Sequence, residues 1–227
     1  MIYAIADLHL DYTENKSMEV FGDGWANYQE RIFSNWEKIV NEDDTVLIPG
    51  DISWAMQLDD ALVDLKRIDK SPGRKILTRG NHDYWWSGIS KLRKLDLESI
   101  SFIQNDSLDL GNINICGSRG WLDPTSKEAT EKDEKIFQRE ILRVNMSLES
   151  VRNDNDIIMM LHYPPFDINK QPNELFNCLK NYNVTDLIYG HLHGYGHLNV
   201  VEGKIDGINV HCVSSDYIDF KVKKIKE

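Results

Sequence analysis

The sequence has few cysteines and no long apolar run, and both shortages exclude whole classes of protein. Its three cysteines, Cys116, Cys178 and Cys212, are widely spaced in 227 residues, and none belongs to a CxxC pair. This pattern argues against a disulfide framework or a thiolate metal site and favours a reducing compartment, so we expect a cytoplasmic protein. No apolar run approaches the roughly 20 residues of a membrane span, and Asp7 interrupts the short N-terminal one, so we expect neither a signal peptide nor a membrane partner.

Basic residues are also scarce. The chain has 26 Lys and Arg against 37 Asp and Glu, a formal net charge of −11. Proteins that bind long nucleic acids need a basic footprint, so we expect no such partner here. Glycine and proline, at 14 and 6 residues, are too few for a linker-rich chain, and 41% apolar residues are ordinary for a globular protein. We therefore expect a single domain over residues 1–227.

Short apolar runs alternate with amphipathic stretches along the chain. The runs cover residues 2–6, 45–49, 75–78, 157–161 and 187–189. Each is short and continuous, which is typical of a strand buried on both faces. Apolar stripes at helical spacing lie between several of them, over residues 32–40 and 58–68. The alternation predicts an α/β protein with a mainly parallel sheet.

Other patterns occur in the middle and at the end of the chain. Residues 108–116 predict a β-hairpin around a Gly-Asn turn. The charged segment at about 123–152 carries apolar residues at helical spacing and predicts a long helix, which serves either as a partial lid or as a packing helix. After residue 195, the runs 198–201, 208–213 and 218–222 predict strands of a second, more antiparallel sheet.

Polar side chains follow each of the five buried runs. In chain order they are Asp7 and His9, then Asp51, then Asn81 and His82, then His162, then His191 and His193. Ligands of open α/β sheets bind outside the carboxyl ends of the strands, so these side chains are expected to converge. Residues two apart also face the same side of an extended chain. A set of oxygen and imidazole donors without thiolate suits Mn, Fe, Co or Zn.

These residues lie in five blocks, DLHL, GDISW, GNHDYW, LHYPP and GHLHG. In this order, the blocks resemble the calcineurin-like metallophosphoesterase family from residue 2 to about residue 197. The resemblance implies two stacked mixed β-sheets flanked by helices, in a four-layer α/β/β/α sandwich. It also implies two metal ions (Mn, Fe or Zn), one held by Asp7, His9 and His193 and the other by Asn81, His162 and His191, with Asp51 bridging both and His82 as the catalytic histidine.

The activity that this resemblance implies is hydrolysis of a phosphate ester by a hydroxide that two metal ions activate. The expected substrate is a small molecule, with a nucleotide as one candidate; monoesters and diesters both remain open, as does the oligomeric state. The alternative is an inactive scaffold with the same fold. That alternative calls for missing ligands, and all seven implied ligands are present in the sequence.

Trp54 departs from the family pattern. Many members carry GDxxD, in which the second Asp orients the catalytic histidine, and Trp54 stands at that position here. The sequence therefore does not say what orients His82. Aromatic rings near the motifs can stack on a base or sugar, and an arginine can form paired hydrogen bonds with a phosphate. On this basis Trp54, Trp86 and Arg119 are candidate substrate contacts.

Overall fold

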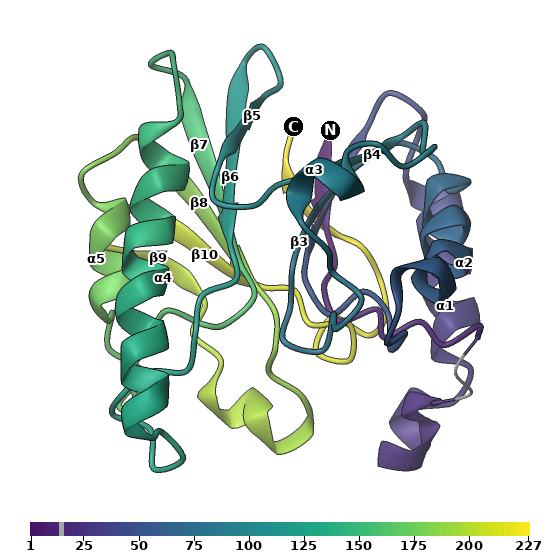
Figure 1. Ribbon diagram of the computed structural model, residues 1–227, viewed down its shortest axis with the longest axis horizontal. Coiled ribbons are helices and arrows are strands. Elements are labelled where there is room, and N and C mark those ends of the chain that lie inside the picture. The colour runs from purple at the N-terminus through teal and green to yellow at the C-terminus, as the bar shows by residue number, and fades with distance from the viewer. Residues whose placement is uncertain (14–15) are drawn as a thin grey trace.

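Two β-sheets face each other at the centre of the protein (Figure 1), in a computed structural model that describes residues 1–13 and 16–227. The first sheet has five strands in the order β11-β1-β2-β3-β4, and the second has six in the order β5-β6-β7-β8-β10-β9. Helices α1 and α2 lie on the outer face of the first sheet, and α4 and α5 lie on that of the second. The predicted four-layer α/β/β/α sandwich is confirmed.

The elements have the following bounds. The first sheet contains β1 (Ile2–Ala4), β2 (Thr45–Pro49), β3 (Arg74–Thr78), β4 (Ile100–Phe102) and β11 (Lys223–Lys226). The second contains β5 (Ser107–Asp109), β6 (Ile113–Ser118), β7 (Asp156–Leu161), β8 (Val184–Tyr189), β9 (Gly203–Ile205) and β10 (Ile208–Cys212). The helices are α1 (Tyr28–Ile39), α2 (Leu58–Asp69), α3 (Ile89–Leu92), α4 (Glu131–Glu149) and α5 (Glu174–Leu179), with 3₁₀ turns η1 (Met18–Phe21), η2 (Asp23–Trp25) and η3 (Gly194–Asn199).

The continuous apolar runs are explained by burial on both faces of each sheet. In β2, Val46 and Ile48 belong to the core under α1 and α2, whereas Leu47 belongs to the core between the sheets. In β7, Met159 faces the helices of the second sheet and Met160 faces the other sheet. Strands β1 to β4 are parallel to one another, as are β6, β7, β8 and β10. All their carboxyl ends therefore reach one edge of the molecule.

Helix α4 begins at a capping box, in which the side chains of Thr130 and Asp133 bond each other's backbone amides. Its apolar stripe, with Phe137, Val144 and Leu148, is buried in the core outside the second sheet. The helix contacts β6 and α5. The long helix expected in this segment is present as α4. Whether it acts as a partial lid stays a prediction.

The end of the chain differs from two expectations. Residues 198–201, expected as a strand, overlap the 3₁₀ turn η3, and Leu198 is 74% exposed. Residues 218–222 do not form the expected strand, because Asp219 and Phe220 have positive φ angles, which a strand does not accept. The strand β11 begins after them, at Lys223. The second sheet is also less antiparallel than expected: β10 pairs parallel with β8, and only the edge strands β5 and β9 run antiparallel in the described residues. The predicted hairpin is confirmed as β5–β6.

Candidate active site

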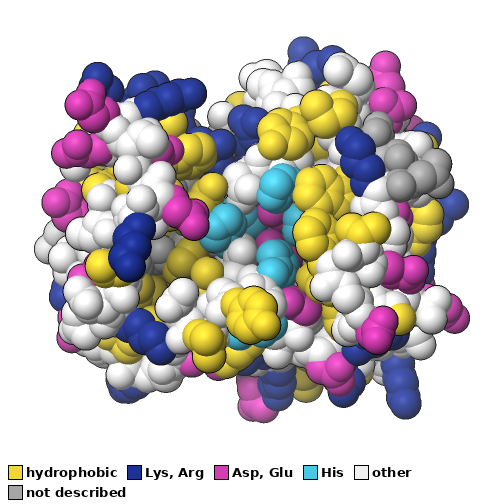
Figure 2. Space-filling model, turned by 90° about the horizontal axis from the view of Figure 1, so that it is seen from below, with side chains coloured by type: hydrophobic (Ala, Val, Ile, Leu, Met, Phe, Trp, Pro, Cys, Tyr) yellow, Lys and Arg dark blue, Asp and Glu magenta, His cyan; other side chains and the backbone are white. Residues whose placement is uncertain are grey.

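The predicted metal ligands converge in a hollow on one face of the molecule. Figure 2 shows this face, where histidine side chains gather around acidic ones between the two halves of the protein. The ligands come from the loops after β1, β2 and β3 of the first sheet and after β7 and β8 of the second. A parallel bridge between Ala6 and Ser214 joins the sheets beside Asp7. The hydroxyl of Ser215 also donates to the Asp7 carbonyl oxygen at 2.8 Å.

Two overlapping groups of side chains have the geometry to hold a metal ion. One consists of Asp7, His9 and His193, and the other of Asp7, Asp51 and His162, with one donor atom of each residue within 4.8 Å of the others in its group. The His193 Nε2 atom lies 3.4 Å from Asp7 Oδ1. Asp51 Oδ2 lies 3.7 Å from His9 Nε2 and 3.4 Å from His162 Nε2, so this carboxylate faces both groups.

The remaining two predicted ligands adjoin the second group. Asn81 Oδ1 lies 2.7 Å from His162 Nε2 and 3.0 Å from His191 Nδ1. The two imidazole nitrogens are themselves 3.3 Å apart. The structure thus brings all seven predicted ligands together, and its donors are the carboxylate, amide and imidazole groups that transition-metal ions accept.

Several polar atoms of this cluster are buried without a hydrogen-bond partner. They include His9 Nδ1, His193 Nε2 and His82 Nδ1. Buried polar groups in folded proteins are nearly always hydrogen-bonded, so each exception calls for a physical reason. His193 Nε2 lies 3.4 Å from Asp7 Oδ1, and a cation held by these residues would supply that reason. The donor set therefore fits the metal ions that the sequence implied.

Burial keeps two of the predicted ligands neutral. It lowers the pKa of His9 to about 4 and that of His191 to about 3. The pKa of His82 is also lowered, mainly by burial. Neutral imidazole has a free lone pair, which is the form that binds a metal ion.

The other two histidines lie against carboxylates that outweigh the effect of burial. Although burial opposes their charge, Asp51 raises the pKa of His162 to about 9, and Asp7 with Asp216 raises that of His193 to about 10. In turn, although burial opposes it, His193 holds the pKa of Asp7 below its usual range, and His162 does the same for Asp51. The acidic side chains thus attract positive charge into the cluster, in the form of protons or of metal ions.

The backbone at these strand ends is unusual. Asp7, His9, Asp51 and His191 all have φ angles between 42° and 73°, in the left-handed region. The pairs two residues apart therefore do not meet through an extended chain, as the sequence suggested, but through sharp left-handed turns. Such conformations cost on the order of 1–3 kcal/mol each for residues other than glycine and persist where the surrounding structure enforces them. Gly80 is needed here, since a Cβ atom at this position would lie 2.1 Å from Asp51 Oδ1.

The carboxylate of Asp83 holds two of these loops together. It is fully buried, and Oδ2 accepts hydrogen bonds from the amides of Asp51 (2.9 Å) and Gly80 (2.7 Å). Its Oδ1 accepts from the amides of Ile52 (2.9 Å) and Ser53 (3.3 Å) and from the indole of Trp85. Burial, followed by the charge of Asp51, raises the pKa of Asp83 to about 6. The role of this side chain was not predicted from the sequence.

Asp216 is a second site residue that the sequence analysis missed. Its Oδ1 accepts a hydrogen bond from His193 Nδ1 at 2.8 Å. Its Oδ2 accepts from the amide of Gly194 at 3.1 Å and lies 3.1 Å from His197 Nε2. A carboxylate behind a ligating histidine fixes the ring and its tautomer. The signal was present: Asp216 follows the strand at 208–213, just as the other polar residues follow theirs.

His82 is positioned by aromatic rings. Its ring centroid lies 4.6 Å from that of Trp54 and 6.2 Å from that of Tyr84. Trp54 also stacks on His9, with centroids 4.7 Å apart, and the His82 amide donates to Asp51 Oδ1 at 2.8 Å. Trp54 therefore packs against His82 at the position where many family members have a carboxylate.

The three candidate substrate contacts lie in different surroundings. Trp54 is half-buried among the site histidines. Trp86 is only 7% exposed, belongs to the core of the first sheet and donates its indole N–H to Gln104, and its substrate role stays a prediction. Arg119 lies over the ring of Trp121, with its guanidinium carbon 4.2 Å from the centroid.

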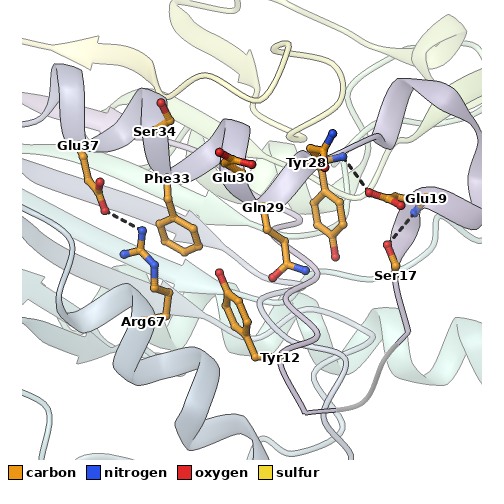
Figure 3. Close-up of a pocket in the computed structure, with 11 residues that line it drawn as sticks. Tyr12, Ser17, Glu19, Tyr28, Gln29, Glu30, Phe33, Ser34, Glu37 and Arg67 are labelled. Carbon is orange, nitrogen blue, oxygen red and sulfur yellow. Dashed lines mark hydrogen bonds and ion pairs between the residues drawn. The ribbon is translucent and has the colours of Figure 1, made fainter.

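A further cavity lies away from the predicted ligands. It has a volume of about 640 Å³ and is lined from α1, α2 and the segments before α1, including Tyr12, Gln29 and Phe33 (Figure 3). One lining residue, Tyr28, reaches the site from behind, where its hydroxyl donates to the His9 carbonyl oxygen at 2.5 Å. Among the described residues there is no helix long and apolar enough to cross a bilayer.

With this geometry established, comparison with known proteins defines the class. The profile of the calcineurin-like phosphoesterase family matches residues 1–195, which include all seven predicted ligands and His82. The chain therefore belongs to the calcineurin-like phosphoesterase family, whose general activity is phosphoester hydrolysis.

Individual relatives are more distant. Gene 66 protein of Mycobacterium phage L5 is 33% identical over 78 residues, which is 34% of this chain and 37% of that protein, so the match spans little more than a third of the relative's length. The crystal structure of phosphopantetheinyl hydrolase (PptH) from Mycobacterium tuberculosis matches with a TM-score of 0.58 and 14% identity, over 99% of this chain and 95% of that one. A protein of unknown function from Aquifex aeolicus matches with a TM-score of 0.47 and 20% identity, over 98% and 94%. At 14% identity the match to phosphopantetheinyl hydrolase supports the fold alone.

Proposed function

We propose that this protein is a dinuclear, metal-dependent hydrolase of small phosphate esters. The observation that supports this most directly is the convergence of seven donor side chains from five strand ends, in a chain of the phosphoesterase family. Asp7, His9 and His193 would hold one ion; Asn81, His162 and His191 would hold the other. Asp51, whose carboxylate faces both groups, would bridge them.

The side chains have separate tasks in this proposal. Two bound ions would polarise the phosphoryl group and supply a strong nucleophile from water at neutral pH. Asp51 and Asp7 bring the negative charge that retains cations, and Asp216 keeps His193 in its ligating orientation. His82, held by Trp54, would donate a proton to the leaving oxygen or stabilise the charge that develops on it, a role worth about 10²–10⁴ in rate.

The experiment compares hydrolysis of p-nitrophenyl phosphate and bis-p-nitrophenyl phosphate with and without added Mn²⁺. We expect activity that depends on Mn²⁺, is removed by EDTA and is lost in Asp51→Asn. Asp123→Asn is the matched control, because Asp123 is buried and hydrogen-bonded to Asn173 outside the site. Metal binding without hydrolysis of either ester would contradict the proposal and favour the inactive scaffold.

The same assay divides the remaining alternatives. Preference for the diester would indicate a phosphodiesterase, and preference for the monoester a phosphatase, with nucleotides among the candidates for both. Zn²⁺ and Fe²⁺ replace Mn²⁺ in parallel reactions to identify the ion. A cytoplasmic location stays a prediction and is supported by the three cysteines, all of which are free.

A further inference from the structure

A small basic cavity adjoins the candidate metal site. It has a volume of about 80 Å³ and lies at the same edge of the sheets, between the ends of β3 and β6, the segment after β4, and α4. The polar residues that line it include Arg79, Asn105, Ser118, Arg119, Glu140 and Arg143. Because a single water needs only about 10–15 Å³ of such space, the cavity has room for several waters, or for one group of the size of phosphate.

Positive charge dominates the lining. Three guanidinium groups, those of Arg79, Arg119 and Arg143, face one carboxylate, Glu140, which leaves an excess of two positive charges in a chain whose net charge is −11. Glu140 is fully buried, and its oxygens already accept from the Ser118 hydroxyl at 2.7 Å, the Gly120 amide at 3.1 Å and Arg143 at 2.5 Å. Glu140 therefore balances no more than one of the three arginines.

The arginines are held in place but incompletely paired. Arg79 Nε is buried and has no hydrogen-bond partner. Arg119 is fixed over Trp121, and the nearest approach of its guanidinium to Glu140 is 4.0 Å. The pKa of Arg119 is lowered, first by burial, with further contributions from Arg79 and Arg143 that Glu140 opposes. An anion among these groups would relieve both the repulsion and the missing hydrogen bond.

The predicted metal ligands do not line this cavity, but two of its arginines are connected to them through the chain. Arg79 stands two residues before the predicted ligand Asn81 in the same loop. The carbonyl oxygen of Arg119 accepts the amides of His162 and Tyr163, each at 3.0 Å. The ring of Tyr163 in turn lies 4.1 Å from that of His191. Arg79 and Arg119 are therefore linked to the predicted ligands through a shared loop and backbone hydrogen bonds, and we expect a substrate bound at the metal site to reach the cavity.

We propose that the cavity formed by Arg79, Arg119 and Arg143 is a second anion subsite, which binds a phosphate group of the substrate other than the one that is cleaved. The inference rests on the proposed function and narrows its substrates to small molecules that carry two phosphate groups. Guanidinium groups match phosphate oxygens through paired hydrogen bonds, and they discriminate against singly phosphorylated compounds because the cavity is otherwise left with unpaired charge.

The subsite is tested first without catalysis. Inorganic phosphate is titrated into EDTA-treated protein by calorimetry, where the metal site itself cannot retain it. We expect binding that weakens at least tenfold in Arg79→Gln and in Arg143→Gln, but not in Arg139→Gln, the control on the same helix, whose guanidinium donates to the Lys135 carbonyl. The assignment to a phosphate group would be overturned by absence of binding, by binding as tight in both variants as in the wild type, or by binding of acetate as tight as that of phosphate.

A kinetic test then compares 1,n-alkanediol bisphosphates, with two to six carbons, against the matching monophosphates in the presence of Mn²⁺. At the spacing that fits, we expect kcat/KM to be at least tenfold higher for the bisphosphate, and this ratio to fall toward one in Arg79→Gln and Arg143→Gln. A ratio near one at every spacing would overturn the subsite while leaving the phosphoesterase intact. Phosphate binding without hydrolysis of any ester would instead contradict the proposed function and keep the subsite.

Discussion

Replacing Asp83 by asparagine tests whether one buried carboxylate holds the ligand loops in place. The carboxylate accepts five N–H groups, two on Oδ2 and three on Oδ1. Asparagine keeps a single acceptor oxygen. In its better orientation the amide N–H₂ group faces the two donors on the Oδ2 side, the amides of Asp51 and Gly80.

The cost follows from these two unpaired donors. A buried donor left without a partner costs about 1–3 kcal/mol, so Asp83→Asn should lower the free energy of unfolding by about 2–6 kcal/mol. That is a large part of the 5–15 kcal/mol that is typical of a folded domain. Because the affected loops carry Asp51 and Asn81, metal affinity should fall at least tenfold, as is usual when the support of a ligand is removed.

The assay measures urea unfolding in EDTA and Mn²⁺ binding by calorimetry. Asp69→Asn is the matched control, since Asp69 accepts the amides of Glu98 and Ser99 at 3.1 and 2.8 Å but lies outside the site. We expect the control to lose stability and retain its affinity for Mn²⁺. If Asp83→Asn binds Mn²⁺ as tightly as the control does, Asp83 does not position the ligand loops and the reasoning is refuted.

Three further predictions concern the site and the core. His82→Ala should lower kcat by about 10²–10⁴ at unchanged metal content, measured by elemental analysis; equal loss of metal would refute its catalytic role. Asp216→Asn should weaken Mn²⁺ binding about 10–100-fold, because His193 Nδ1 loses its carboxylate, and a calorimetric titration matching the wild type would contradict this. Burial lowers the pKa of Lys75 to about 8, below the ordinary value near 10.5, so the unfolded chain binds more protons between these values and stability rises with pH across that window. Urea unfolding of Lys75→Met should lack this rise, and an identical pH profile in the two proteins would exclude Lys75 as its cause.

The strand ends of the site could be predicted from the sequence because two local signals coincide there. Each buried run is continuous, as a strand covered on both faces requires, and each is followed at once by residues such as Asp7, Asp51 or His162 that have no place in an apolar core. Parallel strands bring such ends to one edge, so the gathering of the ligands needs no knowledge of long-range contacts.

The supporting residues could not be predicted in the same way. Asp83 acts through the backbone amides of a loop 30 residues away, which no local pattern encodes. Asp216 follows a strand as the ligands do, but its contact with the ring of His193, 23 residues away, does not follow from that position alone. Residues 198–201 have the composition of a strand, yet Leu198 is exposed, so their conformation depends on tertiary context rather than on apolar pattern. The burial of Trp86 could not be predicted either, because proximity to a motif does not determine whether a ring is exposed.

The bridge between Ala6 and Ser214 has a consequence for the cohesion of the molecule. The chain passes from the first sheet to the second between Phe102 and Ser107, and it returns between Cys212 and Lys223. Predicted ligands from the two sheets, such as Asp51 and His162, would bind the same ion. Metal ions bound there would cross-link the two sheets. Metal binding should then slow hydrogen exchange in the amides of both sheets together, so that the stability of the fold and the occupancy of the metal site depend on each other.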